Sequence, residues 1–155
     1  MKKGFLCGFL LLSLMGCKIE EETIIVQEEI EEVTMKEEMV LYIDETKVEV
    51  EWEDNASVDA LKELCKDSTI TIQMSMYGGF EQVGSLGTTL VREDVQTVTN
   101  YGDIVLYSGN QIVIFYGSNS WAYTRLGHIV DQDEKGMEEL LGKKDVVVTI
   151  SLEEK

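Results

Sequence analysis

The sequence predicts a mainly β domain of the α+β class, in which about eight short strands close into a small barrel with two short helices. Apolar and polar residues alternate in several runs, most clearly over residues 69–76, and this period is typical of strands with one buried face. Two runs, residues 104–107 and 112–116, are almost wholly apolar and flank a Gly-Asn turn, which predicts a central hairpin buried on both faces. Closing such a sheet removes its edges, whereas an open α+β sandwich is the alternative.

Length and charge limit the possible functions. With 155 residues, 44% of them hydrophobic, the chain suits one globular domain and a short appendage. The formal net charge is −17, from 13 Lys and Arg against 30 Asp and Glu, and this argues against a nucleic-acid partner, since phosphates bind cationic surfaces. The acidity serves solubility and self-repulsion, or it favours a basic ligand.

Residues 1–16 have the pattern of an export signal. Lys2 and Lys3 precede an apolar run that is too short to span a bilayer and that ends in Leu-Met-Gly-Cys17. This ending resembles the lipobox of bacterial lipoproteins, and the resemblance implies a diacylated Cys17 as the first residue after cleavage. An ordinary secretory signal that contains a cysteine is the alternative. We therefore expect a lipid anchor in the cell membrane, with the protein on the extracytoplasmic side.

Residues 17–38 are predicted to be a tether between the anchor and the domain. Nine glutamates and two lysines lie in residues 18–38, and the apolar residues among them form no lasting helical stripe. A mostly disordered spacer is the favoured interpretation, and a short helix is the alternative. The remaining residues, 39–155, are expected to fold alone as a β-rich monomer.

The domain begins with a predicted hairpin and a helix. Residues 40–43 are expected to pair with an alternating strand at 47–53, and Asn55 is a candidate N-cap for a helix of about three turns. One side of this helix carries four apolar residues, Val58, Leu61, Leu64 and Cys65. Cys7 leaves with the signal and Cys17 carries lipid, so Cys65 has no disulfide partner and is interpreted as a buried structural thiol.

Residues 77–87 are rich in glycine and are predicted to be a loop that follows the strand at 69–76. A phosphate site there lacks the fingerprint spacing, a following lysine and a helix start, so backbone turns explain the glycines better. Near the end of the chain, Asp133 is a candidate cap for a short helix that Gly142 ends. The alternating residues 146–152 then predict a closing strand.

Several of these segments resemble one family, the bacterial cyclophilin-like domain of unassigned function. The resemblance covers roughly residues 39–152 and implies a cyclophilin-type closed β-barrel, with little implied about activity. It rests on Tyr77-Gly78-Gly79-Phe80-Glu81, Gly84, Leu86, Tyr101-Gly102-Asp103-Ile104-Val105-Leu106-Tyr107, Val113-Ile114-Phe115-Tyr116, Tyr123-Thr124-Arg125-Leu126-Gly127, Leu141-Gly142 and Asp145-Val146.

The chain also departs from this family and from the active enzymes of the same fold. Gln82 and Gly87 stand where the family often has lysine and proline. Cyclophilin prolyl isomerases carry a Phe-His-Arg stretch with the catalytic arginine, and nothing here matches it, since the single histidine, His128, has no adjacent arginine. Isomerase activity is therefore not carried over, and we assign no catalytic residue.

A binding module for a small molecule or peptide is the favoured function, with a divergent peptidyl-prolyl isomerase-like enzyme as the alternative. With one histidine and no paired ligand spacing, the chain lacks the clustered ligands of a typical metal site, so no metal or cofactor is expected. A nucleophilic triad is also disfavoured, because only this histidine could serve as its base. The candidate groove residues are the aromatic and charged side chains near loops, namely Tyr77, Glu81, Trp121, Tyr123 and Arg125.

Arg125 has two interpretations. Strand alternation places it on the same face as Tyr123, where a planar cation stacks on an aromatic ring or binds a carboxylate of a ligand. Alternatively, Arg125 pairs with Glu81 and pins the glycine-rich stretch onto the barrel.

Overall fold

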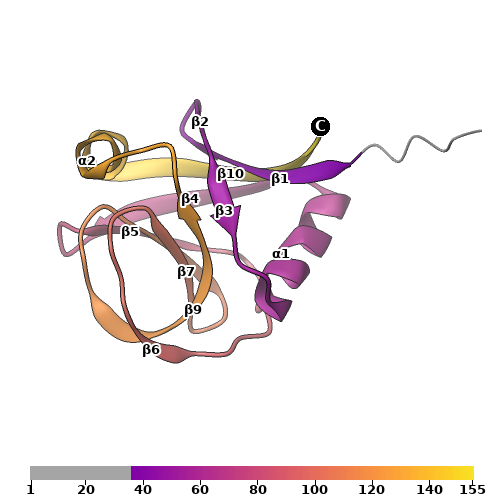
Figure 1. Ribbon diagram of the computed structural model, residues 1–155, viewed down its shortest axis with the longest axis horizontal. Coiled ribbons are helices and arrows are strands. Elements are labelled where there is room, and N and C mark those ends of the chain that lie inside the picture. Colours follow the sequence, from indigo (N-terminus) through magenta and orange to yellow (C-terminus); the bar gives the residue numbers. More distant parts are fainter. Residues whose placement is uncertain (1–35) are drawn as a thin grey trace, which may run out of the picture. The chain divides into compact units, whose positions relative to one another are not determined.

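The computed structural model describes residues 36–155, which form ten strands and two helices (Figure 1). The predicted signal peptide, Cys17 and the tether as far as residue 35 lie outside the described residues. In chain order the elements are β1 (Glu37–Ile43), β2 (Thr46–Val48), β3 (Val50–Trp52), α1 (Ala56–Asp67), β4 (Ile70–Tyr77), β5 (Glu81–Ser85), β6 (Val95–Val98), β7 (Asp103–Tyr107), β8 (Gln111–Phe115), β9 (Ser120–Ile129), α2 (Glu134–Leu141) and β10 (Asp145–Glu154).

The strands form one antiparallel sheet that nearly closes on itself. Its order is β2-β1-β10-β4-β5-β8-β7-β9-β3, and β6 pairs separately with the first half of β9. The two end strands of this order, β2 and β3, are separated in the chain by Glu49 alone. The backbone oxygen of Glu49 accepts a hydrogen bond from the Val130 N–H at 2.9 Å, which ties this junction to the end of β9. The predicted closed barrel is confirmed, and the open sandwich is not.

Both helices begin where their capping residues predict. The Asn55 Oδ1 accepts a hydrogen bond from the backbone N–H of Val58 at 3.0 Å, and an Asp133 carboxylate oxygen accepts one from that of Gly136 at 2.8 Å. Helix α1 buries three of the four predicted residues, and α2 buries Met137 and Leu141. Within residues 36–155, neither helix has the length and apolar character that a membrane crossing requires.

The central hairpin β7–β8 is buried on both faces, as predicted. Alternate residues of these strands, such as Ile104 and Ile114, belong to the main core inside the barrel. The residues between them belong to a second apolar group, the outer cluster, which consists of Val105, Val113, Phe115 and Tyr123. Residues that alternate along a strand point to opposite faces, so the outer cluster lies on the outside of the barrel wall.

The predicted loop at residues 77–87 is wrong, because most of this stretch is a β-hairpin. Strand β5 pairs with β4, and only residues 78–80 form the turn, where Gly78 and Gly79 have φ of 66° and 77°. Gly84 lies within β5, where a Cβ would come within 2.5 Å of Ile72 Cγ2. The sequence of β5 contains a glycine and has no alternating apolar pattern, so this strand was not predicted. The exposed strand β6 also lacks an alternating pattern and was not predicted either.

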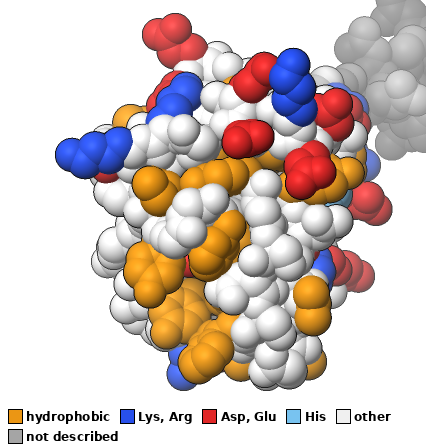
Figure 2. Space-filling view, turned by 90° about the vertical axis from the view of Figure 1, so that its left-hand side faces the viewer, with side chains coloured by type: hydrophobic (Ala, Val, Ile, Leu, Met, Phe, Trp, Pro, Cys, Tyr) orange, Lys and Arg blue, Asp and Glu red, His pale blue; other side chains and the backbone are white. Residues whose placement is uncertain are grey.

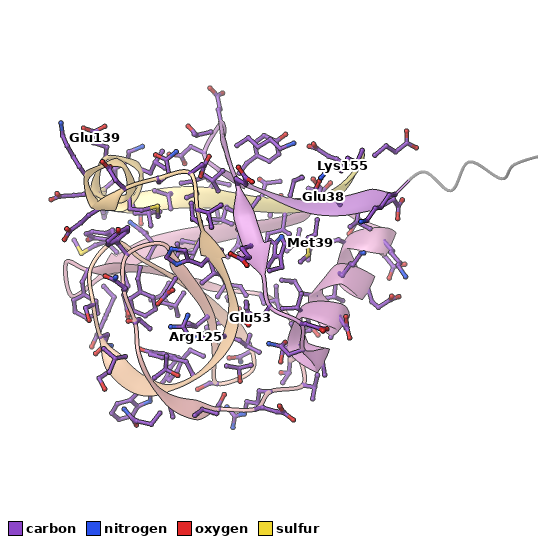
Figure 3. The ribbon with its side chains drawn as sticks, viewed as in Figure 1. Glu38, Met39, Glu53, Arg125, Glu139 and Lys155 are labelled. Carbon is purple, nitrogen blue, oxygen red and sulfur yellow. The ribbon has the colours of Figure 1, made fainter. Side chains whose placement is uncertain are left out.

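The first strand takes in two residues that the sequence analysis placed in the tether. Glu37 and Glu38 are paired with Glu154 and Glu153 of β10. Next to these paired residues, the Lys155 Nζ lies 3.1 Å from a carboxylate oxygen of Glu38 (Figure 3). The strand therefore extends the barrel back to Glu37.

Candidate binding pocket

A pocket of about 460 Å³ lies on the outside of the barrel wall, over the outer cluster. Residues from β4, β5, β7, β8 and β9 line it, together with Asn119 from the turn before β9. The full lining is Ser75, Met76, Tyr77, Glu81, Val83, Tyr107, Gln111, Val113, Asn119, Trp121 and Tyr123.

Cross-strand pairing brings these residues together. Val83 of β5 is opposite Val113 of β8, and Val113 is in turn opposite Val105 of β7. Residues opposite each other in a sheet point to the same face, so this row forms a continuous apolar floor. Tyr107 and Gln111, which are also paired, continue the same face toward the end of the hairpin.

Aromatic side chains form the wall and part of the rim. The Tyr123 ring packs edge-on against Tyr107 and Phe115, with centroid distances of 6.1 Å and 5.7 Å. Tyr77 is 67% exposed and Trp121 is 57% exposed, although both line the pocket. Figure 2 shows a face of the molecule on which hydrophobic side chains gather around a hollow, with most of the charged side chains in view above them.

Glu81 is the one acidic residue in this lining, and it is buried. Only 6% of its surface is exposed, and its Oε2 atom has no hydrogen-bond partner among the described residues. Burial raises the pKa of Glu81 to about 7, and the side-chain amide of Asn119 offsets only part of this effect. No Lys, Arg or His is among the lining residues, so the protein supplies no counter-ion there.

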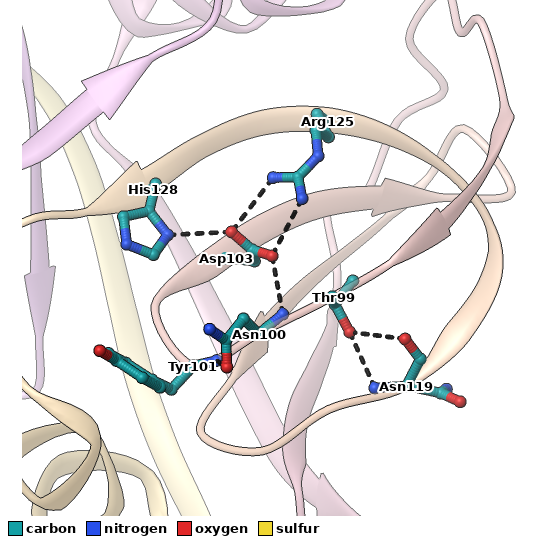
Figure 4. Close-up of polar contacts among 7 residues, drawn as sticks. All are labelled: Thr99, Asn100, Tyr101, Asp103, Asn119, Arg125 and His128. Carbon is teal, nitrogen blue, oxygen red and sulfur yellow. Dashed lines mark hydrogen bonds and ion pairs between the residues drawn. The ribbon is translucent and has the colours of Figure 1, made fainter.

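Arg125 does not line the pocket, and its predicted pairing with Glu81 is wrong. Its two terminal nitrogens donate hydrogen bonds to the two carboxylate oxygens of Asp103, at 3.1 Å each (Figure 4). The prediction that Arg125 shares a face with Tyr123 agrees with the pairing of Arg125 with Val105, which belongs to the same outer cluster as Tyr123. Arg125 is therefore part of the barrel wall beside the pocket.

Asp103 is the centre of a polar network that fixes the start of β7. Its carboxylate also accepts a hydrogen bond from the Asn100 N–H at 2.8 Å and lies 2.9 Å from the Nδ1 of His128. A Cβ on Gly102 would lie 2.9 Å from the His128 ring, so the turn before β7 packs closely on β9. The single histidine of the chain thus serves this network, outside the pocket.

Four of the five residues proposed from the sequence line the pocket: Tyr77, Glu81, Trp121 and Tyr123. The floor residues and the polar rim were not predicted from the sequence. Period-two spacing from Tyr107 and Val113 indicates which neighbours share their face, yet both strands are apolar throughout and give no sign of which face is open. Asn119, which donates to the Tyr123 hydroxyl at 3.0 Å, had no signal in the sequence beyond its place in a polar turn.

Comparison with known protein families identifies a matching family. The model of a family described as the cyclophilin-like family matches residues 41–151. No curated protein and no solved structure matches the chain.

Proposed function

We propose, from the premise that this chain belongs to the cyclophilin-like family, that it is a binding protein whose outer pocket holds a small organic molecule or a peptide segment. In this proposal Cys17 carries the lipid that anchors the domain to the membrane on its extracytoplasmic side. The fold alone does not support the proposal, because one fold serves many functions. The support comes from the pocket.

The proposal rests on an aromatic pocket that contains one buried carboxyl group, whose Oε2 atom has no hydrogen-bond partner among the described residues. Its volume of about 460 Å³ lies within the range of about 300–1,000 Å³ that is typical of ligand sites. Such sites combine an apolar lining with a few polar groups that orient the ligand, and here Glu81, Asn119 and Gln111 supply them. Ordinary wall packing explains neither the hollow nor the missing partner of Glu81.

Filling the pocket is expected to abolish binding. Gln111 lines it, is only partly exposed and has no side-chain hydrogen bond among the described residues, so Gln111→Trp places an indole in the hollow at little cost to folding. A metabolite and peptide library is screened against the purified protein by ligand-observed NMR. Compounds that bind the parent are expected to lose at least about tenfold in affinity for the variant.

The matched control is Gln73→Trp. Gln73 is an exposed residue of β4 and does not line the pocket, so this substitution adds the same side chain to the same sheet. Its affinities should equal those of the parent. A screen without any binder, or binders that Gln111→Trp and Gln73→Trp affect alike, would refute the pocket as the binding site.

The alternative, a divergent prolyl isomerase, predicts catalysis on a proline peptide. We expect no detectable acceleration, because neither Arg125 nor His128 reaches the pocket and both bind Asp103. Uncatalysed isomerisation takes about 10–100 s, which leaves a wide window for the assay. A clear, cyclosporin-sensitive increase in rate would replace the binding proposal with the enzymatic one.

Replacing Cys17 with Ser tests the anchor. We expect the variant to lose lipid labelling and to leave the membrane fraction, since two acyl chains are what hold such a protein in a bilayer. Cys7→Ser, which changes a cysteine within the predicted signal, serves as the control and should keep both properties. Unchanged labelling and membrane retention in Cys17→Ser would show that this cysteine is not the lipid site.

A further inference from the structure

We propose that the ligand carries a protonated amine, whose N–H groups donate hydrogen bonds to the carboxylate of Glu81 in the outer pocket. This inference rests on the proposed function, because it specifies the chemistry of the ligand for the same pocket. It narrows the ligand class to organic amines that carry an N–H when protonated, including a free peptide N-terminus or a lysine side chain.

One carboxylate oxygen of Glu81 lacks a hydrogen-bond partner among the described residues. Glu81 is more than nine-tenths buried and lines the pocket, but Oε2 accepts no hydrogen bond from any described residue. A buried polar atom without a partner is costly, and buried charges in proteins are normally paired. A donor that enters through the pocket would remove this cost.

The charge of the pocket and of the chain favours a cationic ligand. The pocket lining contains one acid and no base, so a ligand must bring the counter-ion for Glu81. The chain as a whole carries a net charge of −17, and such a field attracts cations and repels anions. An organic acid, or a peptide bound through its carboxylate, is disfavoured on both counts.

The aromatic wall of the pocket also suits an ammonium group. Tyr107 and Tyr123 stand in the lining with Glu81, and Trp121 lies at the rim. An ammonium group is attracted to the faces of Tyr and Trp rings, most strongly where water is excluded. A quaternary ammonium would satisfy the rings but offers no N–H to Oε2, so an amine with free N–H groups fits both features.

Titration of Glu81 makes this binding depend on pH. Its pKa is about 7, so the carboxylate is largely formed at pH 8, where an alkylamine is still protonated. The other titratable groups in the pocket lining are phenols, on Tyr77 of β4, Tyr107 of β7 and Tyr123 of β9. Tyr116, which follows β8 outside this lining, interacts electrostatically with Glu81. Burial raises the pKa of Tyr116 and of Tyr123 above 10, so these two do not titrate over this range. Below pH 7, binding of an amine must expel a proton from Glu81.

Calorimetric titration of the purified protein with 2-phenylethylamine and with the neutral 2-phenylethanol tests the inference. These probes share one ring and differ in the terminal group. At pH 8 we expect the amine to bind at least about tenfold more tightly, as for a hydrogen bond to a charged group. At pH 5.5, where Glu81 is largely protonated, the amine should lose most of this preference, while binding of the alcohol changes little.

Glu81→Gln is expected to remove the preference for the amine and its pH dependence. A far-ultraviolet circular dichroism spectrum equal to that of the parent shows that the variant is folded. Glu138→Gln removes the same charge from α2, outside the pocket lining, and should behave as the parent.

Three results would overturn the inference. They are equal affinities of the two probes for the parent, an amine preference that Glu81→Gln does not reduce, and no binding of either probe. If the library screen still yields ligands that Gln111→Trp abolishes, the pocket remains a binding site and only the amine chemistry is wrong. If that screen fails as well, the proposed function fails with it.

Discussion

Arg125→Met is expected to lower the free energy of unfolding by about 2–3 kcal/mol. The substitution leaves the Asp103 carboxylate, whose side chain is 5% exposed, without its bidentate partner. Removing one member of a fully buried ion pair costs about 3–5 kcal/mol, and the expected loss is smaller because the Arg125 side chain is 38% exposed. Urea denaturation followed by circular dichroism measures it.

Arg92→Met is the matched control. Arg92 lies 3.5 Å from Asp94, and both side chains are more exposed than Asp103, so this surface pair contributes less than about 1 kcal/mol. A second test combines Arg125→Met with Asp103→Asn, because a neutral amide needs no counter-ion, and part of the stability should return. Similar losses for the two arginines would show that Asp103 does not depend on Arg125.

The pairing of Arg125 with Glu81, predicted from the sequence, is wrong because of the order of the strands in the sheet. Glu81 lies on β5 and Arg125 on β9, and strands β8 and β7 lie between these two in the sheet. With about 4.8 Å between neighbouring strands, the two backbones are roughly 14 Å apart. Asp103 is on β7, the strand beside β9, and the register shift in that pairing sets which residues meet. Strand order and register depend on distant contacts that no local pattern encodes.

Local features were predictable because neighbouring residues determine them. Asn55 and Asp133 cap their helices through bonds to a backbone N–H three residues later, and the central hairpin follows from two apolar runs around one turn. The aromatic part of the pocket was also predictable, from Tyr and Trp residues near loops. The depth of the pocket was not predictable, because Val83 and Val113 form its floor only through the pairing of β5 with β8.

Glu81→Gln is expected to make the protein more stable above pH 7, by about 2 kcal/mol, with little change near pH 4.5. In the folded protein, burial raises the pKa of Glu81 from 4.5 to about 7, while the unfolded chain keeps the ordinary value. Between these values the folded state holds a proton that the unfolded state has released. The stability of the parent therefore falls as pH rises through this window, and above it the full cost of ionising a buried carboxyl remains. Glutamine has no proton to lose and avoids that cost.

The comparison of variant with parent isolates this effect from other carboxyl groups. The backbone N–H of Val147 lowers the pKa of Asp44, which therefore stabilises the fold above its ordinary pKa and loses that contribution as pH falls. Asp44 is present in both proteins, so its effect cancels when unfolding free energies are subtracted at each pH from 4.5 to 8. A difference that grows with pH indicates a carboxylate that is destabilising until a ligand pairs with it. Parallel curves would mean that Glu81 ionises without cost, and the pocket would then have no need of a cation.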